Sequence, residues 1–310
     1  MKNEDGKYIF LFLFIKLYKF ILITFISLIF FCSSHRIKIA LCTMGKKENL
    51  YVKEFVDYYI KLGIDKIFIY DDNEPKTEKI TDVIGNLNKK IIIYENKKKR
   101  IKRQSEAYND CYKNNKNNYD WFLMIDMDEF LVIVNNTLKK YISSKIFKKC
   151  DFIKFHWAFS NDNNLLHYDN RSLFERFKGP FIKSQFIKSM IRGNINKLKY
   201  SVHSPKESPE KNITCNNIGN IIKSKIINFE YINPINIEKA FIIHFKFKST
   251  EEFIRKYKRG YKNWFGNHTE WWKNQNIIKY FKYNKITKEK IEYLERELKL
   301  NLTEYKKLIK

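Results

Sequence analysis

The chain has 310 residues, a formal net charge of +26 and a hydrophobic fraction of 44%. That much apolar material excludes a disordered protein and is enough for one large α/β domain or two small ones. The charge raises the question of nucleic-acid binding. Because lysines occur along the whole chain among many Asn and Ile residues, a solvated basic surface is the better interpretation, and we do not expect nucleic acid as a partner.

The five cysteines are scattered along the chain: Cys32, Cys42, Cys111, Cys150 and Cys215. They show neither a CxxC motif nor the Cys/His spacing of zinc sites, so the sequence predicts no zinc knuckle. Their odd number leaves the pairing into disulfides open.

Residues 8–31 are almost wholly apolar and aromatic. Lys16 and Lys19 interrupt the run, but their long side chains can reach the membrane surface while the segment crosses the bilayer. We therefore expect residues 1–35 to be an N-terminal signal anchor of a single-pass membrane protein. The folded domain would follow it, in a Golgi-like part of the secretory pathway if the cell is eukaryotic. A cleaved signal peptide is the alternative, since Ser33 and Ser34 are small but form no clear A-x-A pattern.

Apolar runs alternate with helical spacing between residues 37 and 125. Strands are predicted over 37–43, 66–70, 90–94 and 121–125, and helices over 50–62, 80–87 and 104–112, with Gly63 ending the first helix. This alternation indicates an α/β fold with a largely parallel sheet flanked by helices. GxGxxG and P-loop motifs are absent from the sequence, which argues against a dinucleotide site or an NTP cradle of those types.

We expect one domain over residues 36–265 and an aromatic and basic C-terminal extension over 266–310. From about residue 287 the extension shows Ile291, Leu294, Leu298 and Leu302 at helical spacing, which indicates a docked amphipathic helix.

The apolar run 121–125 is followed directly by the carboxylates Asp126, Asp128 and Glu129. In open α/β sheets ligands bind beyond the carboxyl ends of the strands, so these acids stand where a substrate would bind. Asp126 and Asp128 point the same way in an extended stretch, and two hard oxygen ligands suit Mn²⁺ or Mg²⁺. A strand that ends in solvated acids, with Asp128 capping a helix, explains the spacing equally well.

Several stretches in order resemble glycosyltransferase family 92, whose members have the GT-A nucleotide-sugar fold. They are IALCTMGKKENLYVKEFVDYYIKLGIDKIFIYDDNE, QSEAYNDCY, WFLMIDMDEFL, FHWAFSNDN, RSLFERF, FIKSMIR and IIHFKFKSTEEFIRKYKRG, and they span about residues 38–260. The chain departs from the family at Phe159-Ser160, where Phe-Gly is usual, and this puts the shape of that loop in doubt.

The resemblance implies transfer of a sugar, often galactose, from a nucleotide donor such as a UDP-sugar to a hydroxyl of a glycan or glycoconjugate, with inversion at the anomeric carbon. It assigns Mn²⁺ or Mg²⁺ to Asp126 and Asp128, with His244 as the late histidine that completes the metal shell in many GT-A enzymes. His244 also fits a core histidine without a metal.

An inverting transfer needs a general base for the acceptor hydroxyl. Glu175 is the first candidate and Asp162 the second. Pairing of Glu175 with Arg171 or Arg176 is the structural alternative.

Donor contacts are expected at four places. Asp71, Asp72 and Asn73 end a predicted strand, although the same residues also favour turns. Gln104, Tyr108 and Asn109 resemble the family's helix beside the nucleotide. Cations that could meet the diphosphate are Arg100, Arg103, Lys183, Lys188, Arg192 and Lys248, each of which could instead be a solvated charge. His203 is a further candidate for the diphosphate or the acceptor, and Trp264, Trp271 and Trp272 could stack on an acceptor sugar or pack the tail.

Asn135, Asn170, Asn212, Asn267 and Asn301 each begin an N-x-S/T sequon, which chance also produces in an Asn-rich chain. Two other functional classes fit parts of the sequence. A basic nucleic-acid-binding protein fits the charge but lacks a recognisable RRM or KH module. A nucleotidyltransferase could use the same paired acids and metal on a similar sheet.

Overall fold

The computed structural model describes residues 16–19, 21–22, 36–85, 88–95, 104–207, 212–222, 232–259 and 269–302. The chain divides into two compact units, residues 1–37 and 38–310. In the first unit, 16–19 and 21–22 are helical. Across the described ranges we find no helix that is both long and apolar enough to cross a bilayer. The rest of the expected anchor lies outside the described residues, so the anchor stays a prediction.

The first half of the second unit alternates strands and helices as predicted. Its elements are β1 (Ile39–Gly45), α2 (Asn49–Leu62), β2 (Lys66–Asp71), α3 (Ile80–Ile84), β3 (Ile91–Glu95), α4 (Gln104–Asn115) and β4 (Trp121–Met124). Gly63 ends α2 in the left-handed region at φ 104°, where its N–H reaches the carbonyl of Ile60. Glycine adopts this conformation without a steric penalty, which is why the sequence marks the end of this helix so clearly.

The second half is richer in antiparallel strands. It contains β5 (Glu129–Ile133), α5 (Leu138–Ile142), η1 (Lys145–Phe147), β6 (Phe152–Phe159), α6 (Leu173–Arg176), β7 (Ile182–Arg192), β8 (Lys199–Tyr200), β9 (Pro205–Glu207), β10 (Thr214–Asn216), β11 (Ala240–His244), α7 (Thr250–Arg259), α8 (Thr269–Tyr283) and α9 (Lys288–Leu298).

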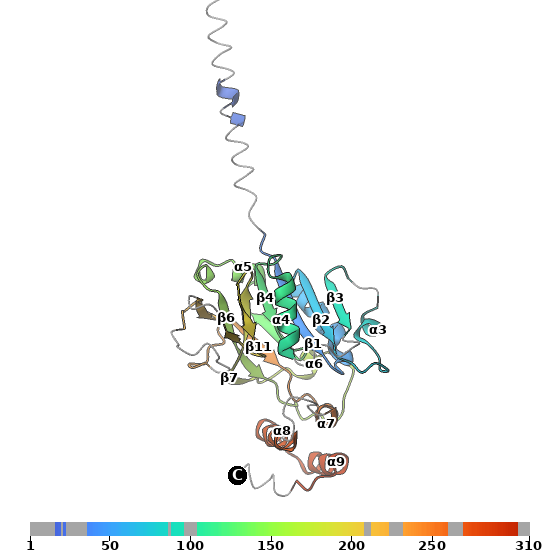
Figure 1. Cartoon of the computed structure of the whole chain (residues 1–310). Helices are drawn as coiled ribbons and strands as arrows, with labels where there is room; N and C mark the ends of the chain where they lie inside the picture. Colours follow the sequence, from blue (N-terminus) through green and yellow to red (C-terminus); the bar gives the residue numbers. More distant parts are fainter. Residues whose placement is uncertain are drawn as a thin grey trace, which may run out of the picture. The chain divides into compact units, whose positions relative to one another are not determined.

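One large sheet organises the unit (Figure 1), with the strand order β3-β2-β1-β4-β7-β6-β11-β5 and β10 added beside β6. Strands β3, β2, β1 and β4 are parallel, whereas β7 runs antiparallel to both β4 and β6, and β5 runs antiparallel to β11. The mixed, mostly parallel sheet with flanking helices confirms the predicted α/β class. This order brings β4 and β5, which are consecutive in the chain, to separate places in the sheet, and the acidic stretch connects them.

Helix α4 covers one face of the sheet over β1 and β4 (Figure 1). Tyr108 and Tyr112 of α4 pack there against Phe122 and Met124 of β4. A disulfide between Cys42 of β1 and Cys111 adds a covalent link between helix and sheet. Helix α4 is therefore fixed rigidly beside the strand that leads to the acidic residues.

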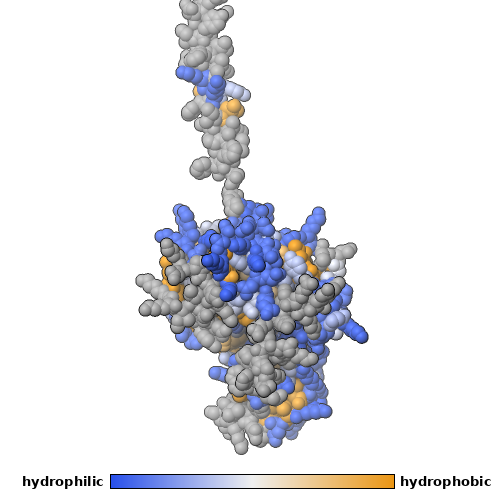
Figure 2. Space-filling view, in the orientation of Figure 1, coloured by the Kyte–Doolittle hydropathy of each residue, from blue (hydrophilic) through white to orange (hydrophobic). Residues whose placement is uncertain are grey.

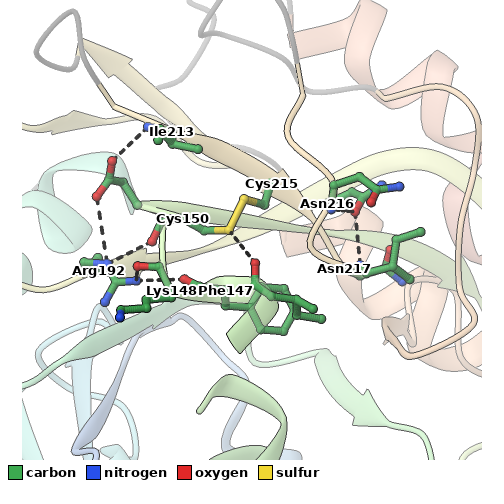
Figure 3. Close-up of a disulfide and its surroundings, with 12 residues drawn as sticks. Phe147, Lys148, Cys150, Arg192, Ile213, Cys215, Asn216 and Asn217 are labelled. Carbon is green, nitrogen blue, oxygen red and sulfur yellow. Dashed lines mark hydrogen bonds and ion pairs between the residues drawn. A yellow bond between two sulfur atoms is a disulfide. The ribbon is translucent and has the colours of Figure 1, made fainter. Parts of the chain in front are cut away.

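A second disulfide joins Cys150, just before β6, to Cys215 of β10 (Figure 3). The guanidinium of Arg192 lies beside it and donates to the carbonyls of Cys150 and Phe147, each at 2.9 Å. The two bridges settle the pairing of four of the five cysteines.

Helices α7, α8 and α9 form a separate small core beyond one end of the strands (Figure 1). It contains Phe247, Phe253, Tyr280 and Leu294, all buried. Thr287 caps α9 by accepting from the N–H of Lys290, and the burial of Leu294 in this core confirms a docked helix, which ends at Leu298 before Leu302. On the face shown in Figure 2, hydrophilic side chains cover most of the described surface and hydrophobic ones form small separate areas, as expected of a solvated surface.

Candidate active site

The acidic stretch lies at the carboxyl end of β4, as the apolar run predicted. All four residues of β4 are buried, and the N–H of Glu129 bonds back to the carbonyl of Asp126 at 3.1 Å. This tight turn connects β4 to β5. The N–H of Phe245 donates to the carbonyl of Asp128 at 2.9 Å, so the residue after β11 is held against the turn.

Asp126 lies at the centre of a polar cluster built by α4 and β7. Its Oδ1 accepts from Tyr108 OH at 2.8 Å and from Lys188 Nζ at 2.6 Å, and it also accepts from Gln104 Nε2. Lys188 is fully buried, whereas a quarter of the Asp126 side chain is exposed. Gln104 and Tyr108 thus contact Asp126, their expected contact with the nucleotide stays a prediction, and Lys188 is an internal counter-ion of Asp126.

Asp128 faces His244 and Lys256. Its Oδ2 lies 2.7 Å from Lys256 Nζ on α7, and its Oδ1 lies 3.5 Å from His244 Nε2 at the end of β11. Burial alone would raise the pKa of Asp128, but Lys256 and His244 hold that pKa well below the usual value. Asp128 is therefore an anion that already attracts two groups from the C-terminal part of the chain.

Glu129 lies beneath both aspartates and is fully buried. Its Oε2 accepts from the N–H of Asp126 at 3.0 Å and lies 3.6 Å from Lys188 Nζ. Burial and the charge of Asp126 raise the pKa of Glu129 well above its usual value.

The spacing of Asp128 and His244 determines which divalent-cation site these side chains can form. The 3.5 Å between Asp128 Oδ1 and His244 Nε2 is a gap that an ion with ligand distances of about 2.1 Å can bridge. Over the described part of the chain, no three His, Cys, Asp or Glu side chains gather into a complete ligand set. The residues therefore fit an ion that takes one oxygen and one nitrogen from the protein and its other ligands from substrate and water.

Lys256, the partner of Asp128, also lines a cavity of about 430 Å³ that is strongly basic. It is lined by Lys47, Glu48, Leu50, Tyr51, Lys246, Phe247, Lys248, Glu252, Arg255, Lys256, Lys258 and Arg259. Burial, with Lys279 and Lys256 nearby, lowers the pKa of Lys246 to about 7. Crowded cations of this kind create a field that favours an anionic ligand.

Lys248, an expected diphosphate contact, lies in this cavity. Its Nζ stands 4.0 Å from the centre of the Tyr51 ring and 3.8 Å from Glu48 Oε2. Burial lowers its pKa. Leu50 and Tyr51 from the first turn of α2 line the same cavity, and the expected contact of Lys248 with a diphosphate stays a prediction.

His203 lies on the other side of His244, beyond Trp157. The Trp157 ring is 4.6 Å from the His244 ring and 5.1 Å from the His203 ring. His203 Nδ1 is 3.2 Å from the carbonyl of Ile187, and burial lowers the pKa of this histidine to about 3. His203 is therefore a neutral imidazole that faces an aromatic wall, which fits a sugar contact better than a diphosphate contact.

Asp71 and Asn73 shape the loop after β2. Asp71 accepts from the N–H groups of Asn73 and Ile80, each at 2.8 Å, and Asn73 Oδ1 accepts from Lys47 N at 2.6 Å. Asp72 is near Lys46 at 3.8 Å. The structure thus gives Asp71 and Asn73 the turn-forming role that was the alternative, and Asn73 also holds the backbone of Lys47, which lines the cavity.

Asn109 also has a structural role. Its Nδ2 donates to the carbonyl of Tyr200 and its Oδ1 accepts from the N–H of Tyr200, both at 2.8 Å. This pair of bonds ties α4 to β8.

The two base candidates do not meet at Asp126 and Asp128. Glu175 is exposed and closes a capping box on α6, where its Oε2 accepts from Ser172 N at 2.9 Å. Hydrogen bonds from Ser172 lower the pKa of Glu175, which weakens it as a base. Asp162 is buried and accepts from Lys290 Nζ at 2.6 Å and Tyr280 OH at 2.7 Å. The geometry supports neither as the base.

Some of the predicted donor and acceptor contacts lie outside the described residues. Arg100, Arg103 and Trp264 lie outside the described residues, as do the side chains of Trp271 and Trp272.

Comparison with known proteins assigns the family. The model of glycosyltransferase family 92 matches residues 35–302, which include the acidic turn, β11 and α7. The chain belongs to glycosyltransferase family 92. A glycosyltransferase family 92 protein of Ricinus communis is 30% identical over 94 residues, which are 30% of this chain and 17% of that relative. The chain thus matches only a small part of that relative's length, and the resemblance seen in the motifs is confirmed by the family match.

Lys256 contacts Asp128 but was not among the site residues predicted from the sequence. The residue lies on α7, 12 positions after His244, and reaches Asp128 only because α7 folds back over the end of β11. The stretch KYKRG, which begins at Lys256, is a local cluster of cations. It does not stand out in the sequence because lysines are frequent along the whole chain. Lys47 and Arg259 were missed for the same reason.

Proposed function

We propose that this family 92 member is a metal-dependent, inverting hexosyltransferase of the GT-A type. It would move galactose or a similar sugar from a UDP-sugar to a hydroxyl of a glycan or glycoconjugate. One observation carries the proposal: Asp128 lies 3.5 Å from His244 and pairs with Lys256, which lines a cavity of about 430 Å³ rich in lysines and arginines. A nucleoside diphosphate is the ligand class whose charge and size suit this combination.

Asp128 and His244 are the residues that would hold the divalent cation, Mn²⁺ or Mg²⁺. When bound, such an ion stabilises as a Lewis acid the negative charge that grows on the departing diphosphate. Lys246, Lys248 and Lys256 line the cavity next to them and would bind the diphosphate oxygens. In this arrangement Lys256 would exchange its contact with Asp128 for one with the donor.

Asp126 has a different role in the proposal. Its Oδ1 is held by Gln104, Tyr108 and Lys188, which fix the carboxylate in one orientation. A quarter of this firmly held carboxylate is exposed and would accept hydrogen bonds from donor hydroxyls, which orients the sugar or the ribose for reaction.

The test is donor hydrolysis and donor binding by the full-length protein in detergent, against a panel of nucleotide sugars with and without Mn²⁺ or Mg²⁺. We expect metal-dependent turnover of one UDP-sugar, lost in Asp128→Asn. Lys258→Met is the matched control, because Lys258 lines the same cavity but pairs with Glu297 at 2.8 Å. Binding of no nucleotide sugar, together with tight salt-sensitive binding of nucleic acid, would overturn the proposal.

We further propose that the chain is membrane-anchored through residues 1–35 and that its domain lies in an oxidising lumen. Two disulfides between buried cysteines support this, because such bridges persist in the secretory pathway and are rare in reducing compartments. Asn135 and Asn170 are exposed members of N-x-S/T sequons. In a eukaryotic secretory host, glycosidase-sensitive mass at these two positions would support a lumenal domain, and unmodified protein in the cytosol would contradict it.

A further inference from the structure

His244 and Glu129 stand directly opposite each other in the sheet. Strands β11 and β5 are antiparallel, and their register pairs His244 with Glu129. Cross-strand partners of this kind hold their Cβ atoms about 5 Å apart, so their side chains interact on the same face. The pairing is thus imposed by the backbone rather than by a flexible loop.

Each nitrogen of the His244 imidazole faces a different carboxylate. Nε2 lies 3.5 Å from Asp128 Oδ1, and Nδ1 lies 3.8 Å from Glu129 Oε1. Both His244 Nδ1 and Glu129 Oε1 are buried and have no hydrogen-bond partner within the described residues. Buried polar atoms are nearly always hydrogen-bonded, and these two atoms face each other. Each is therefore the best available partner for the other.

The other carboxylate oxygen of Glu129 already has partners. Oε2 accepts from the N–H of Asp126 at 3.0 Å and lies 3.6 Å from Lys188 Nζ, and the side chain is fully buried. Only Oε1 is therefore available, and it points toward His244. An approach of roughly 1 Å would make the 3.8 Å separation a hydrogen bond.

We propose that Glu129 is the positioning residue for His244. A cation in the site would favour the ionised form of Glu129, which accepts a hydrogen bond from Nδ1–H and so fixes the imidazole tautomer in which Nε2 directs its lone pair at a cation shared with Asp128 Oδ1. This inference rests on the proposed function, since it assumes that His244 and Asp128 hold the ion. It also gives a role to Glu129, the third acid of the stretch, since the spacing argument concerned only Asp126 and Asp128.

The experiment measures Mn²⁺ affinity by electron paramagnetic resonance, using the full-length protein with UDP present. Glu129→Met removes the acceptor, and we expect its Mn²⁺ affinity to fall roughly 10–100-fold. Glu129→Gln keeps an acceptor oxygen and should retain most of the affinity. Glu54→Gln is a matched control, because Glu54 caps the N–H of Leu173 and has no contact with the acidic stretch in the described residues.

A second readout follows the tautomer itself. With diamagnetic Mg²⁺ and UDP bound, the ¹⁵N chemical shifts of His244 should show a proton on Nδ1 in the unmutated protein and a shift toward the Nε2-protonated form in Glu129→Met. A purely structural role for Glu129 would lower the melting temperature without changing this tautomer or the affinity of the folded protein.

The outcomes separate the two proposals. If the unmutated protein binds no Mn²⁺ with UDP present, the metal dependence fails and the positioning role fails with it. If the unmutated protein binds Mn²⁺ and Glu129→Met binds it within twofold as tightly, the positioning role alone is overturned.

Discussion

Lys256 Nζ lies 2.7 Å from Asp128 Oδ2, although 128 positions separate the two residues in the chain. The contact connects the acidic turn after β4 to α7. Lys256 also lines the basic cavity, so it links the Asp128 carboxylate to that cavity. Lys256 is 22% exposed in its side chain, which leaves it room to turn toward a ligand.

Replacing Lys256 by Met should weaken donor binding more than the chemical step. Loss of a charge-assisted hydrogen bond costs about 1.5–3 kcal/mol, which corresponds to a rise of roughly 10–100-fold in the donor KM. Steady-state kinetics with varied UDP-sugar measures this. Lys258→Met should leave KM within about twofold. If both variants raised the donor KM equally, Lys256 would contribute only to the overall positive charge of the cavity.

The two aspartates should respond differently to amidation. Asp128→Asn should abolish transfer with a small change in melting temperature, because its partner Lys256 can turn to solvent. Asp126→Asn should abolish transfer and also lower the free energy of unfolding by about 3 kcal/mol, since it leaves the fully buried Lys188 with less compensation. Activity assays beside urea unfolding of both variants test the contrast. Full activity in either variant would contradict the proposed site.

Lys154 should make stability depend on pH. Its side chain is buried without a hydrogen-bond partner in the described residues, and burial lowers its pKa to about 7. Above pH 7, up to about pH 10, the unfolded chain binds a proton that the folded chain does not, so the free energy of unfolding rises with pH. Lys154→Met should raise that free energy by on the order of 5 kcal/mol below pH 7 and flatten the rise.

Urea unfolding of Lys154→Met at pH 6.5 and 9.5 checks this, with the exposed Lys149→Met as control. A variant that is less stable than the unmutated protein at both pH values would show that the Lys154 amine has a partner that stabilises the fold.

Asp162 should prove to be a structural residue. Asp162→Asn leaves Lys290 buried without its counter-ion, which should cost about 3–5 kcal/mol of unfolding free energy. Adding Lys290→Met should recover part of that loss. The folded fraction of the single variant should remain active, and a thousandfold drop in its kcat would instead support Asp162 as the general base.

The sequence predicted the first half of the fold well because each element there carries its own signal. Gly63 ends α2, and the apolar run before Asp126 is a buried strand. The capping box of Ser172 and Glu175 has the local pattern S-x-x-E, which indicates a helix start rather than a catalytic base. Local patterns of this kind depend only on neighbours in the chain.

The site was harder to predict because tertiary contacts assign its roles. Lys188 was expected at the diphosphate, yet β7 brings it under Asp126 as a buried counter-ion. Asp71 was expected at the donor, yet the backbone N–H groups of Asn73 and Ile80 engage it. Which charge meets which carboxylate depends on strand order, and periodicity does not determine the order in which strands lie in a sheet.

The bridge between Cys42 and Cys111 has a practical consequence for anyone who makes this protein. It connects β1 to α4, the helix that carries Gln104 and Tyr108 to Asp126. A bacterial cytoplasm would deliver the chain with free thiols in its core, and refolding would then have to sort four buried cysteines into two correct pairs. Export to a periplasm or an insect-cell medium, where thiol oxidation accompanies folding, is the route by which we expect homogeneous and active material.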